Sequence, residues 1–110
     1  MTFTVDISAA AIKDIYDIKL FVEEITGQGS ADRRLEGIAN TINQLKTLPF
    51  GGAVIPELAN LGINDIRRKP STRDHIVYKL DEANEKLTVI IVYPQKKDFQ
   101  SILTRRILRM

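Results

Sequence analysis

The chain has 110 residues, of which 44% are hydrophobic, and it contains no cysteine. This length suits one domain with a single core, so we expect residues 1–110 to fold as a unit of the common size of roughly 100–150 residues. The lack of cysteine excludes disulfides, a thiol nucleophile and thiolate metal sites, and it fits a reducing compartment. No signal sequence is visible, and no apolar run approaches the ~18 residues of a membrane span. We therefore expect a cytoplasmic protein.

Charge is divided unequally along the chain. Residues 1–66 carry 5 Lys and Arg against 9 Asp and Glu, whereas residues 67–110 carry 11 against 5. The first part is net −4 and the second net +6, which gives the formal charge of +2. A basic region favours a surface that meets phosphate, because Lys and Arg replace the counterions of a nucleic acid. A solvated charged face would have the same composition.

The first 45 residues predict a strand followed by two helices. Phe3, Val5 and Ile7 alternate with polar residues, which is typical of a short half-buried strand. Ser8 can cap a helix whose apolar residues recur at helical spacing, namely Ala11, Ile15, Ile18, Val22 and Ile25. Residues 27–30 break this helix, and a second stripe follows, made of Leu35, Ile38, Ile42 and Leu45. The pattern predicts an αα-hairpin.

The rest of the chain predicts a sheet and a last helix. Two prolines and two glycines make residues 48–58 a loop. Residues 66–69 and 75–80 predict strands with a turn at 70–72, and 82–85 form the next turn. Residues 87–93 are apolar on both faces, which predicts the central strand. A short helix is expected from the spacing of Phe99, Ile102, Leu103 and Ile107, and it carries Arg105, Arg106 and Arg109.

The expected order of elements is therefore β-α-α-β-β-β-α. This is an α+β arrangement, in which the N-terminal strand and αα-hairpin precede an antiparallel β-meander and a short C-terminal helix. We expect a sheet of three or four antiparallel strands, with residues 3–7 at its edge and the hairpin on one face.

Six short segments follow one another in an order and spacing that can be compared with known families. They are Pro49-Phe50-Gly51, Pro56-Glu57-Leu58, Ile66-Arg67-Arg68, His75-Ile76-Val77-Tyr78, Val89 to Tyr93 and Lys96-Lys97-Asp98. In this order and spacing the chain resembles the RelE/ParE family of toxins from bacterial type II toxin–antitoxin modules, over almost its whole length. The resemblance implies a growth-inhibiting protein that is neutralised by a cognate antitoxin encoded beside it.

The resemblance leaves three activities open. Some members of the family cut messenger RNA on the ribosome, others inhibit DNA gyrase without cutting, and a third kind would be a non-toxic member that only pairs with a regulator. The long helical hairpin favours the gyrase-binding branch, whereas the basic meander favours RNA. Partners would be the antitoxin and either gyrase or the ribosome with its message, with no membrane involved.

Cleavage of RNA would need a base, an acid and cations around the phosphate, with no metal or other cofactor. The resemblance implies His75, Glu57, Arg67 and Tyr93 as catalytic candidates if the chain is a ribonuclease. The nuclease branch usually carries arginine at the position matching His75, and several members have histidine near the position of Tyr93. This incomplete set also favours the gyrase-binding branch.

Each candidate also has a structural interpretation. His75 has an ordinary pKa of about 6.5, which suits an acid or a base, but a lone histidine on a strand is often only a hydrogen-bonded edge residue. Tyr93 continues the parity of residues 87, 89 and 91 and could close the core instead of stacking on a base. Glu57 could cap a turn. Arg67 could be buried against a carboxylate.

The remaining cations are candidates for binding phosphate or a target. Arg73, Lys96 and Lys97 should lie at loop ends on the same rim as His75. Residues 67–69 alternate faces on their strand, so Arg68 should face away from Arg67. The last helix adds Arg105 and Arg106, which would either steer a nucleic acid or solvate the helix.

Overall fold

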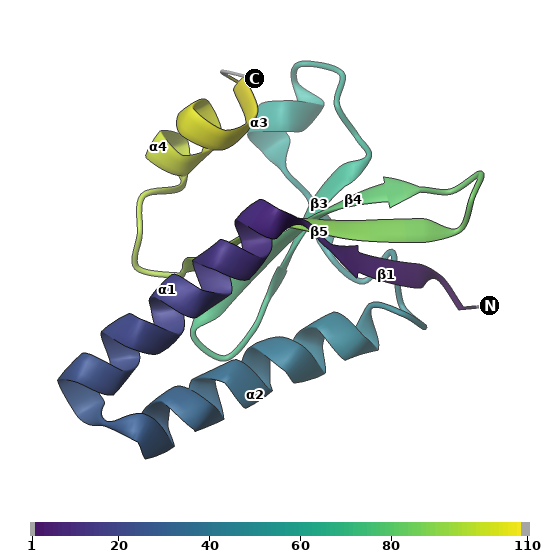
Figure 1. The fold of residues 1–110 in the computed structure, drawn as a ribbon. Helices are drawn as coiled ribbons and strands as arrows, with labels where there is room; N and C mark the ends of the chain where they lie inside the picture. Colours follow the sequence, from purple (N-terminus) through teal and green to yellow (C-terminus); the bar gives the residue numbers. More distant parts are fainter. Residues whose placement is uncertain (1, 109–110) are drawn as a thin grey trace.

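The structure is a computed structural model that describes residues 2–108, and its five strands form one mixed sheet in the order β1-β5-β4-β3-β2 (Figure 1). The strands are β1 (Thr4–Ile7), β2 (Ala53–Val54), β3 (Ile66–Pro70), β4 (Asp74–Asp81) and β5 (Lys86–Pro94). The helices are α1 (Ala9–Thr26), α2 (Gln28–Gln44), α3 (Pro56–Ala59) and α4 (Phe99–Leu103), and α4 continues into a π-helical turn, η1 (Thr104–Leu108). No helix within residues 2–108 is long and apolar enough to cross a membrane.

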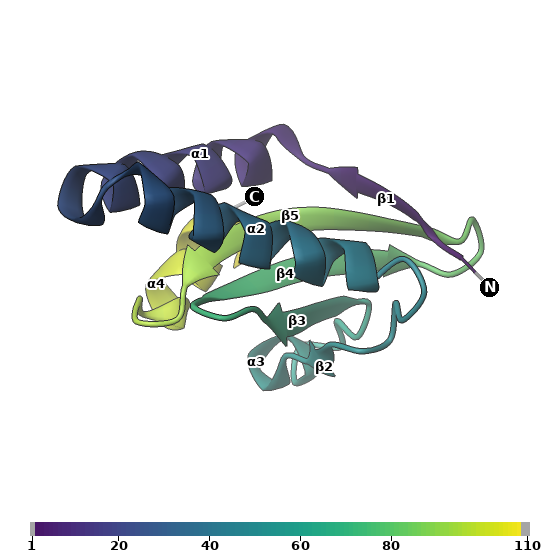
Figure 2. The same cartoon turned by 90° about the horizontal axis from the view of Figure 1, so that it is seen from below.

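Two hydrophobic cores lie on opposite faces of the sheet. The first joins the α1–α2 hairpin to the sheet, and Ile38, Ile76 and Leu87 are among its buried members. The second joins the other face to α3 and α4, with Leu58 and Ile102 among its members. Figure 2 shows the hairpin along one side of β5, β4 and β3. The α+β fold with its αα-hairpin is as predicted.

Local signals build the hairpin. The Ser8 hydroxyl accepts a hydrogen bond from the Ala11 amide at 3.1 Å, which caps α1. Gly27 has φ of 93°, a left-handed conformation that favours glycine, and it is the only residue between the two helices. Ile25 belongs to the apolar stripe but is 65% exposed, because the tip of the hairpin extends past the sheet (Figure 1).

Four expectations about the sheet and the segment before β3 are wrong. It has five strands instead of three or four, and it is mixed, because the hairpin carries the chain across so that β1 pairs with β5 in parallel. β4 is the central strand, and β5 lies between β1 and β4. Residues 48–58 are not all loop, because they contain β2 at the sheet edge and α3, which starts at Pro56, a position where proline is tolerated.

β5 contains one extra residue. Val77 of β4 pairs with Ile91, but the next residue of β4, Tyr78, pairs with Val89, so Ile90 has no partner in β4. This bulge reverses the alternation of side chains. Val89 therefore faces the first core, whereas Ile91 and Tyr93 face the second. The expectation that Tyr93 shares a face with Leu87 and Val89 is wrong for this reason.

The layer assignment predicts where truncation is costly. Leu45 and Ile91 are at most 2% exposed, one in each core. We expect Leu45→Ala and Ile91→Ala each to lower the free energy of unfolding by roughly 2–5 kcal/mol, because each leaves a cavity. Ile25→Ala is the control and should cost under about 0.5 kcal/mol. Urea denaturation measures all three, and losses as small as the control at both core sites would contradict the assignment.

Candidate functional site

Four side chains form a polar and aromatic cluster on the sheet face that lies away from the hairpin. Arg68 donates a hydrogen bond from Nη1 to the Tyr93 hydroxyl at 3.0 Å. The Tyr93 ring stacks on Phe99 at 5.5 Å between centroids, and the Arg68 guanidinium lies 5.0 Å from the centre of the Phe99 ring. The His75 ring lies 5.2 Å from that of Tyr93. The bulge in β5 makes this cluster possible, because it places Tyr93 on the face of Arg68 and His75.

His75 is half-buried at one side of this cluster. Its Nδ1 atom is buried and has no hydrogen-bond partner within residues 2–108. Burial lowers the pKa of His75, the nearby Arg68 lowers it further, and Asp74 acts in the opposite direction. The imidazole is therefore held neutral near pH 7, a form that can accept a proton.

Tyr93 is buried and closes the second core, at 4% exposure. Burial raises the pKa of its phenol, the hydrogen bond from Arg68 lowers it, and the Glu57 carboxylate raises it. Glu57 itself is half-buried in the first turn of α3. The structure therefore brings His75, Tyr93 and Arg68 into contact, and the charge of Glu57 acts on the Tyr93 phenol.

Arg67 lies apart from these residues. Its Nη1 donates to the Gly52 carbonyl at 3.0 Å, and its guanidinium lies 5.3 Å from the centre of the Phe50 ring. No carboxylate pairs with Arg67 within residues 2–108, contrary to the structural interpretation offered above. Arg67 holds the loop before β2 against the sheet.

Tyr78 also holds the loop before β2, through two hydrogen bonds of its hydroxyl. Its hydroxyl donates to the Pro49 carbonyl at 2.8 Å and accepts from the Gly52 amide at 2.9 Å. A Cβ atom at Gly52 would lie 2.5 Å from the Tyr78 hydroxyl oxygen, so this close approach requires glycine. Burial raises the pKa of Tyr78.

A basic rim, which we define as Arg73, Lys96 and Lys97, lies at one end of the sheet. The Gln95 amide donates to the Arg73 carbonyl at 2.9 Å, and the Gln95 side chain donates to the Ser71 carbonyl at 2.9 Å. These bonds hold the two loops side by side. The three cations are exposed, and none forms an ion pair within the described part of the chain.

A buried ion pair beside His75 was not foreseen. Arg34 of α2 donates to both carboxylate oxygens of Asp74, from Nε at 2.8 Å and from Nη2 at 2.6 Å. Asp74 is 1% exposed, and this pair raises the pKa of Arg34. It ties the start of β4 to the hairpin. No pattern in the sequence pointed to it, because Asp74 precedes the expected strand 75–80 and Arg34 lies 40 positions away.

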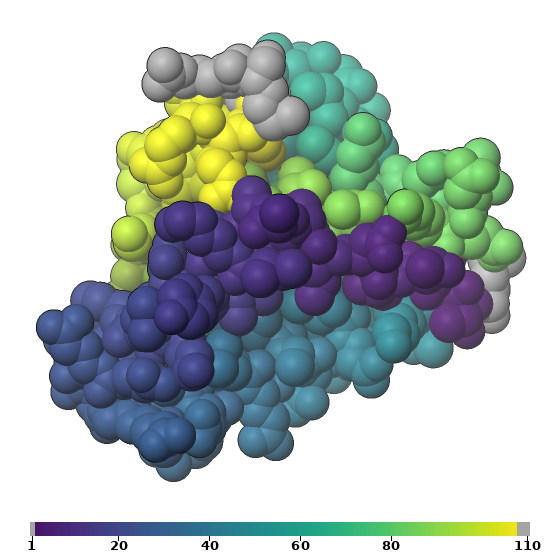
Figure 3. All heavy atoms as spheres, in the orientation of Figure 1, coloured from purple at the N-terminus to yellow at the C-terminus, as the bar shows by residue number. Residues whose placement is uncertain are grey.

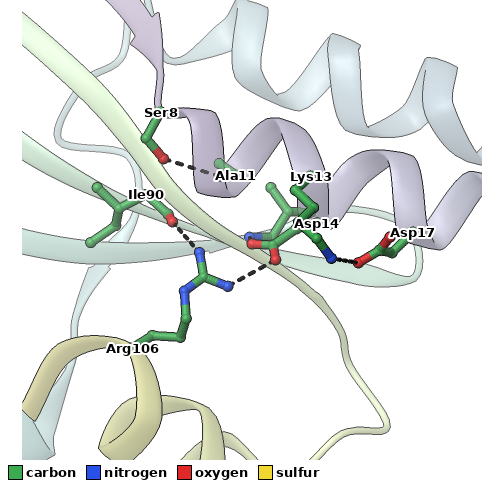
Figure 4. Close-up of polar contacts among 8 residues, drawn as sticks. Ser8, Ala11, Lys13, Asp14, Asp17, Ile90 and Arg106 are labelled. Carbon is green, nitrogen blue, oxygen red and sulfur yellow. Dashed lines mark hydrogen bonds and ion pairs between the residues drawn. The ribbon is translucent and has the colours of Figure 1, made fainter. Parts of the chain in front are cut away.

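The C-terminal arginines differ in their surroundings. Arg105 is exposed. Arg106 donates from Nη1 to Asp14 of α1 at 2.8 Å and from Nη2 to the Ile90 carbonyl at 2.8 Å (Figure 4). Arg109 lies outside the described residues. Of Arg105 and Arg106, Arg105 is therefore the one whose side chain is free of these bonds and exposed to a binding partner.

The hairpin carries a groove and a set of exposed apolar side chains. The groove, of about 470 Å³, is lined mostly by apolar residues of β1, α1 and α2, together with Asn43 and Lys46. α1 lies open in Figure 3, and it carries five large exposed apolar side chains around an exposed Lys13–Asp17 ion pair, namely Ile12, Tyr16, Leu20, Phe21 and Ile25. Within residues 2–108, no group of three or more His, Asp or Glu residues is placed to hold a metal ion.

The fold is that of the RelE/ParE toxins. A chain of the chromosomal ParDE toxin–antitoxin system from P. aeruginosa superimposes with a TM-score of 0.68 at 13% identity, covering 84% of this chain and 96% of that one. A chain of the RelBE2 toxin–antitoxin complex from Mycobacterium tuberculosis gives 0.64 at 14% identity, covering 86% and 100%. A mutant of the E. coli toxin RelE in its free state also gives 0.64 at 14%, covering 100% and 99%.

Comparison of sequences adds no relative. No protein-family profile matches the chain. No curated protein matches it either. The likeness to the toxins is therefore one of structure.

The surroundings of the single histidine predict how it titrates. We expect the pKa of His75, measured from its ring proton signals by NMR, to lie below the ordinary 6.5. Arg68→Gln should raise this pKa, and Asp74→Asn should lower it further. Because folding lowers the pKa, the contribution of His75 to stability is complete above pH 6.5 and is lost as the pH falls toward its folded value. A pKa above 6.5 in the wild-type chain would contradict the geometry.

Proposed function

We propose that this protein is the toxin of a bacterial type II toxin–antitoxin module, that it acts in the cytoplasm, and that it inhibits growth by binding DNA gyrase. The observation that carries the choice of target is the number of large exposed apolar side chains on α1. These side chains are costly to leave in water, and exposed apolar residues gathered on one element are typical of sites that bind another protein. The helices of the hairpin, at 18 and 17 residues, are long enough to present this surface beyond the sheet.

The polar cluster supports the same choice. Arg68 is engaged by Tyr93 and Phe99, and Tyr93 is buried in the second core. A ribonuclease would need these groups free to surround a phosphate, because negative charge develops there during cleavage. In the described arrangement the cluster is packed as a structural element, so binding without cleavage is the better fit.

The proposal includes an antitoxin. Structures with this fold include toxin–antitoxin complexes, and the groove beside β1 offers room for apolar anchors of a segment that folds as it binds. An acidic part of the same segment would lie on the basic meander and the terminal helix. The adjacent gene should encode a short protein with a DNA-binding N-terminal part and an acidic C-terminal part.

A second candidate function is ribosome-dependent cleavage of messenger RNA. The basic rim favours it, because its three cations form no ion pair within residues 2–108 and follow or precede the strand ends that carry His75 and Tyr93. The unpartnered Nδ1 of His75 favours it too, since a neutral imidazole can act as a base. A member of the family without toxicity is the third candidate, and it would bind the antitoxin alone.

Induction of the chain in growing bacteria separates these candidates. We expect DNA replication to fall before translation, and His75→Ala to remain toxic, because the proposed activity needs no acid or base. Phe21→Asp should reduce toxicity, since it places a charge in the proposed gyrase surface. The matched control is Leu61→Asp, a similarly exposed apolar residue, at 61% against 65%, which lies outside the hairpin.

Other outcomes of this experiment favour the other candidates. If messages are cut at defined codons and His75→Ala abolishes cutting, the ribonuclease function is correct, since one acid or base contributes about 10²–10⁴-fold. If the chain accumulates without any effect on growth, the non-toxic reading is correct.

The groove predicts a second set of variants. Ile7→Lys should weaken binding of the antitoxin by about tenfold or more, because it places a charge among the apolar residues that line the groove. Thr4→Lys is the control, since Thr4 is exposed on the same strand but does not line the groove. Titration calorimetry with the purified antitoxin measures both. Equal affinities for the two variants would place the antitoxin elsewhere.

A further inference from the structure

The C-terminal segment, which we define as residues 98–108, is attached to the rest of the protein by apolar contacts and by the polar bonds of a single side chain. The Asp98 carboxylate forms its hydrogen bonds within the segment: it accepts from the Gln100 amide at 3.1 Å and from the Ser101 hydroxyl at 2.9 Å. Within residues 2–108, every hydrogen bond and ion pair from this segment to the rest of the chain comes from one side chain, that of Arg106. The remaining attachment is apolar.

Arg106 reaches two different elements. Its guanidinium donates to Asp14 of α1 and to the carbonyl of Ile90 (Figure 4). The second oxygen of Asp14 accepts from the Val92 amide at 3.0 Å. The edge of β5 is open at this point because β1 ends at Ile7, opposite Val89. The side chains of Arg106 and Asp14 are only 22% and 17% exposed, so water screens this pair less than a surface pair.

The segment covers the polar cluster. Phe99, at its start, stacks on Tyr93 and lies against the Arg68 guanidinium. Ile102 and Leu103 are buried in the second core beside Tyr93. If the segment moved away, the Tyr93 ring and the Arg68 guanidinium would lose this cover, whereas β4 and β5 would keep the backbone bonds that join them.

We propose that the Asp14–Arg106 pair is a latch that holds residues 98–108 as a lid over Arg68 and Tyr93, next to His75. Release of the latch opens this cluster without unfolding the sheet. The latch goes beyond the proposed function and does not depend on whether the target is gyrase or RNA. Arg106 is thus a positioning residue, and it acts on the cluster through Phe99.

Hydrogen exchange on the full chain tests the latch. We expect Arg106→Gln and Asp14→Asn to speed amide exchange in residues 99–108 by about tenfold or more, since each removes a charge-assisted bond that holds the lid. Asp14→Asn keeps an oxygen for the Val92 amide, so it isolates the ion pair from the support of the strand edge. Exchange in β4 and β5 should stay as in the wild type. The control is Arg105→Gln, which changes a neighbouring, exposed arginine.

The ionisation of Tyr93 gives a second readout that a purely stabilising role would not move. Burial raises the pKa of Tyr93 in the closed state, so an open lid should bring it down toward the ordinary 10.0. Ultraviolet titration of Arg106→Gln should show this shift. Adding Tyr93→Phe to that variant assigns the signal, because the phenols of Tyr16 and Tyr78 remain.

Three results would overturn the latch. The first is unchanged exchange in residues 99–108 of both variants. The second is exchange that rises equally in β4, β5 and the segment, which would make the pair a part of the global fold. Failure of both variants to fold would lead to the same conclusion as the second result.

Discussion

The extra residue in β5 determines how the rest of the protein is arranged. Because Ile90 has no partner in β4, the strand turns Val89 toward the hairpin and Tyr93 toward the opposite face. One strand thereby serves two cores. Arg106 donates to the carbonyl of the unpaired Ile90, and Asp14 accepts from the Val92 amide at the edge of β5 that β1 leaves open beyond Ile7. The two cores, the polar cluster and the Arg106 bond to Ile90 all depend on this one irregularity.

The two faces of the sheet are suited to different tasks. On the hairpin side, the groove beside β1 is lined mostly by apolar residues and α1 carries five large exposed apolar side chains, as expected for a face that binds proteins. On the other side, Arg68 and Tyr93 lie against Phe99 of the C-terminal segment, and His75 lies beside Tyr93. A toxin that binds its target and its antitoxin through protein contacts needs the first face exposed, whereas an RNA-cutting relative would need the second.

The spacing of apolar residues and the positions of glycine and proline were enough to predict the hairpin, the meander and the last helix. They could not locate the bulge, because residues 89–93 are apolar at every position and such a run carries no register. The ion pairs Arg34–Asp74 and Asp14–Arg106 span 40 and 92 positions, and no local pattern tells which arginine meets which aspartate. Arg67 and Arg68 were correctly expected on opposite faces, but only packing decides which one joins the cluster.

The central claim is that this toxin fold acts here by binding gyrase and not by chemistry at His75. The most direct measurement is DNA supercoiling by purified gyrase in the presence of the purified chain, carried out with the wild type and with His75→Ala. We predict that both proteins inhibit supercoiling to the same degree. Undiminished supercoiling with both proteins, together with cleavage of ribosome-bound message by the wild type alone, would contradict this account.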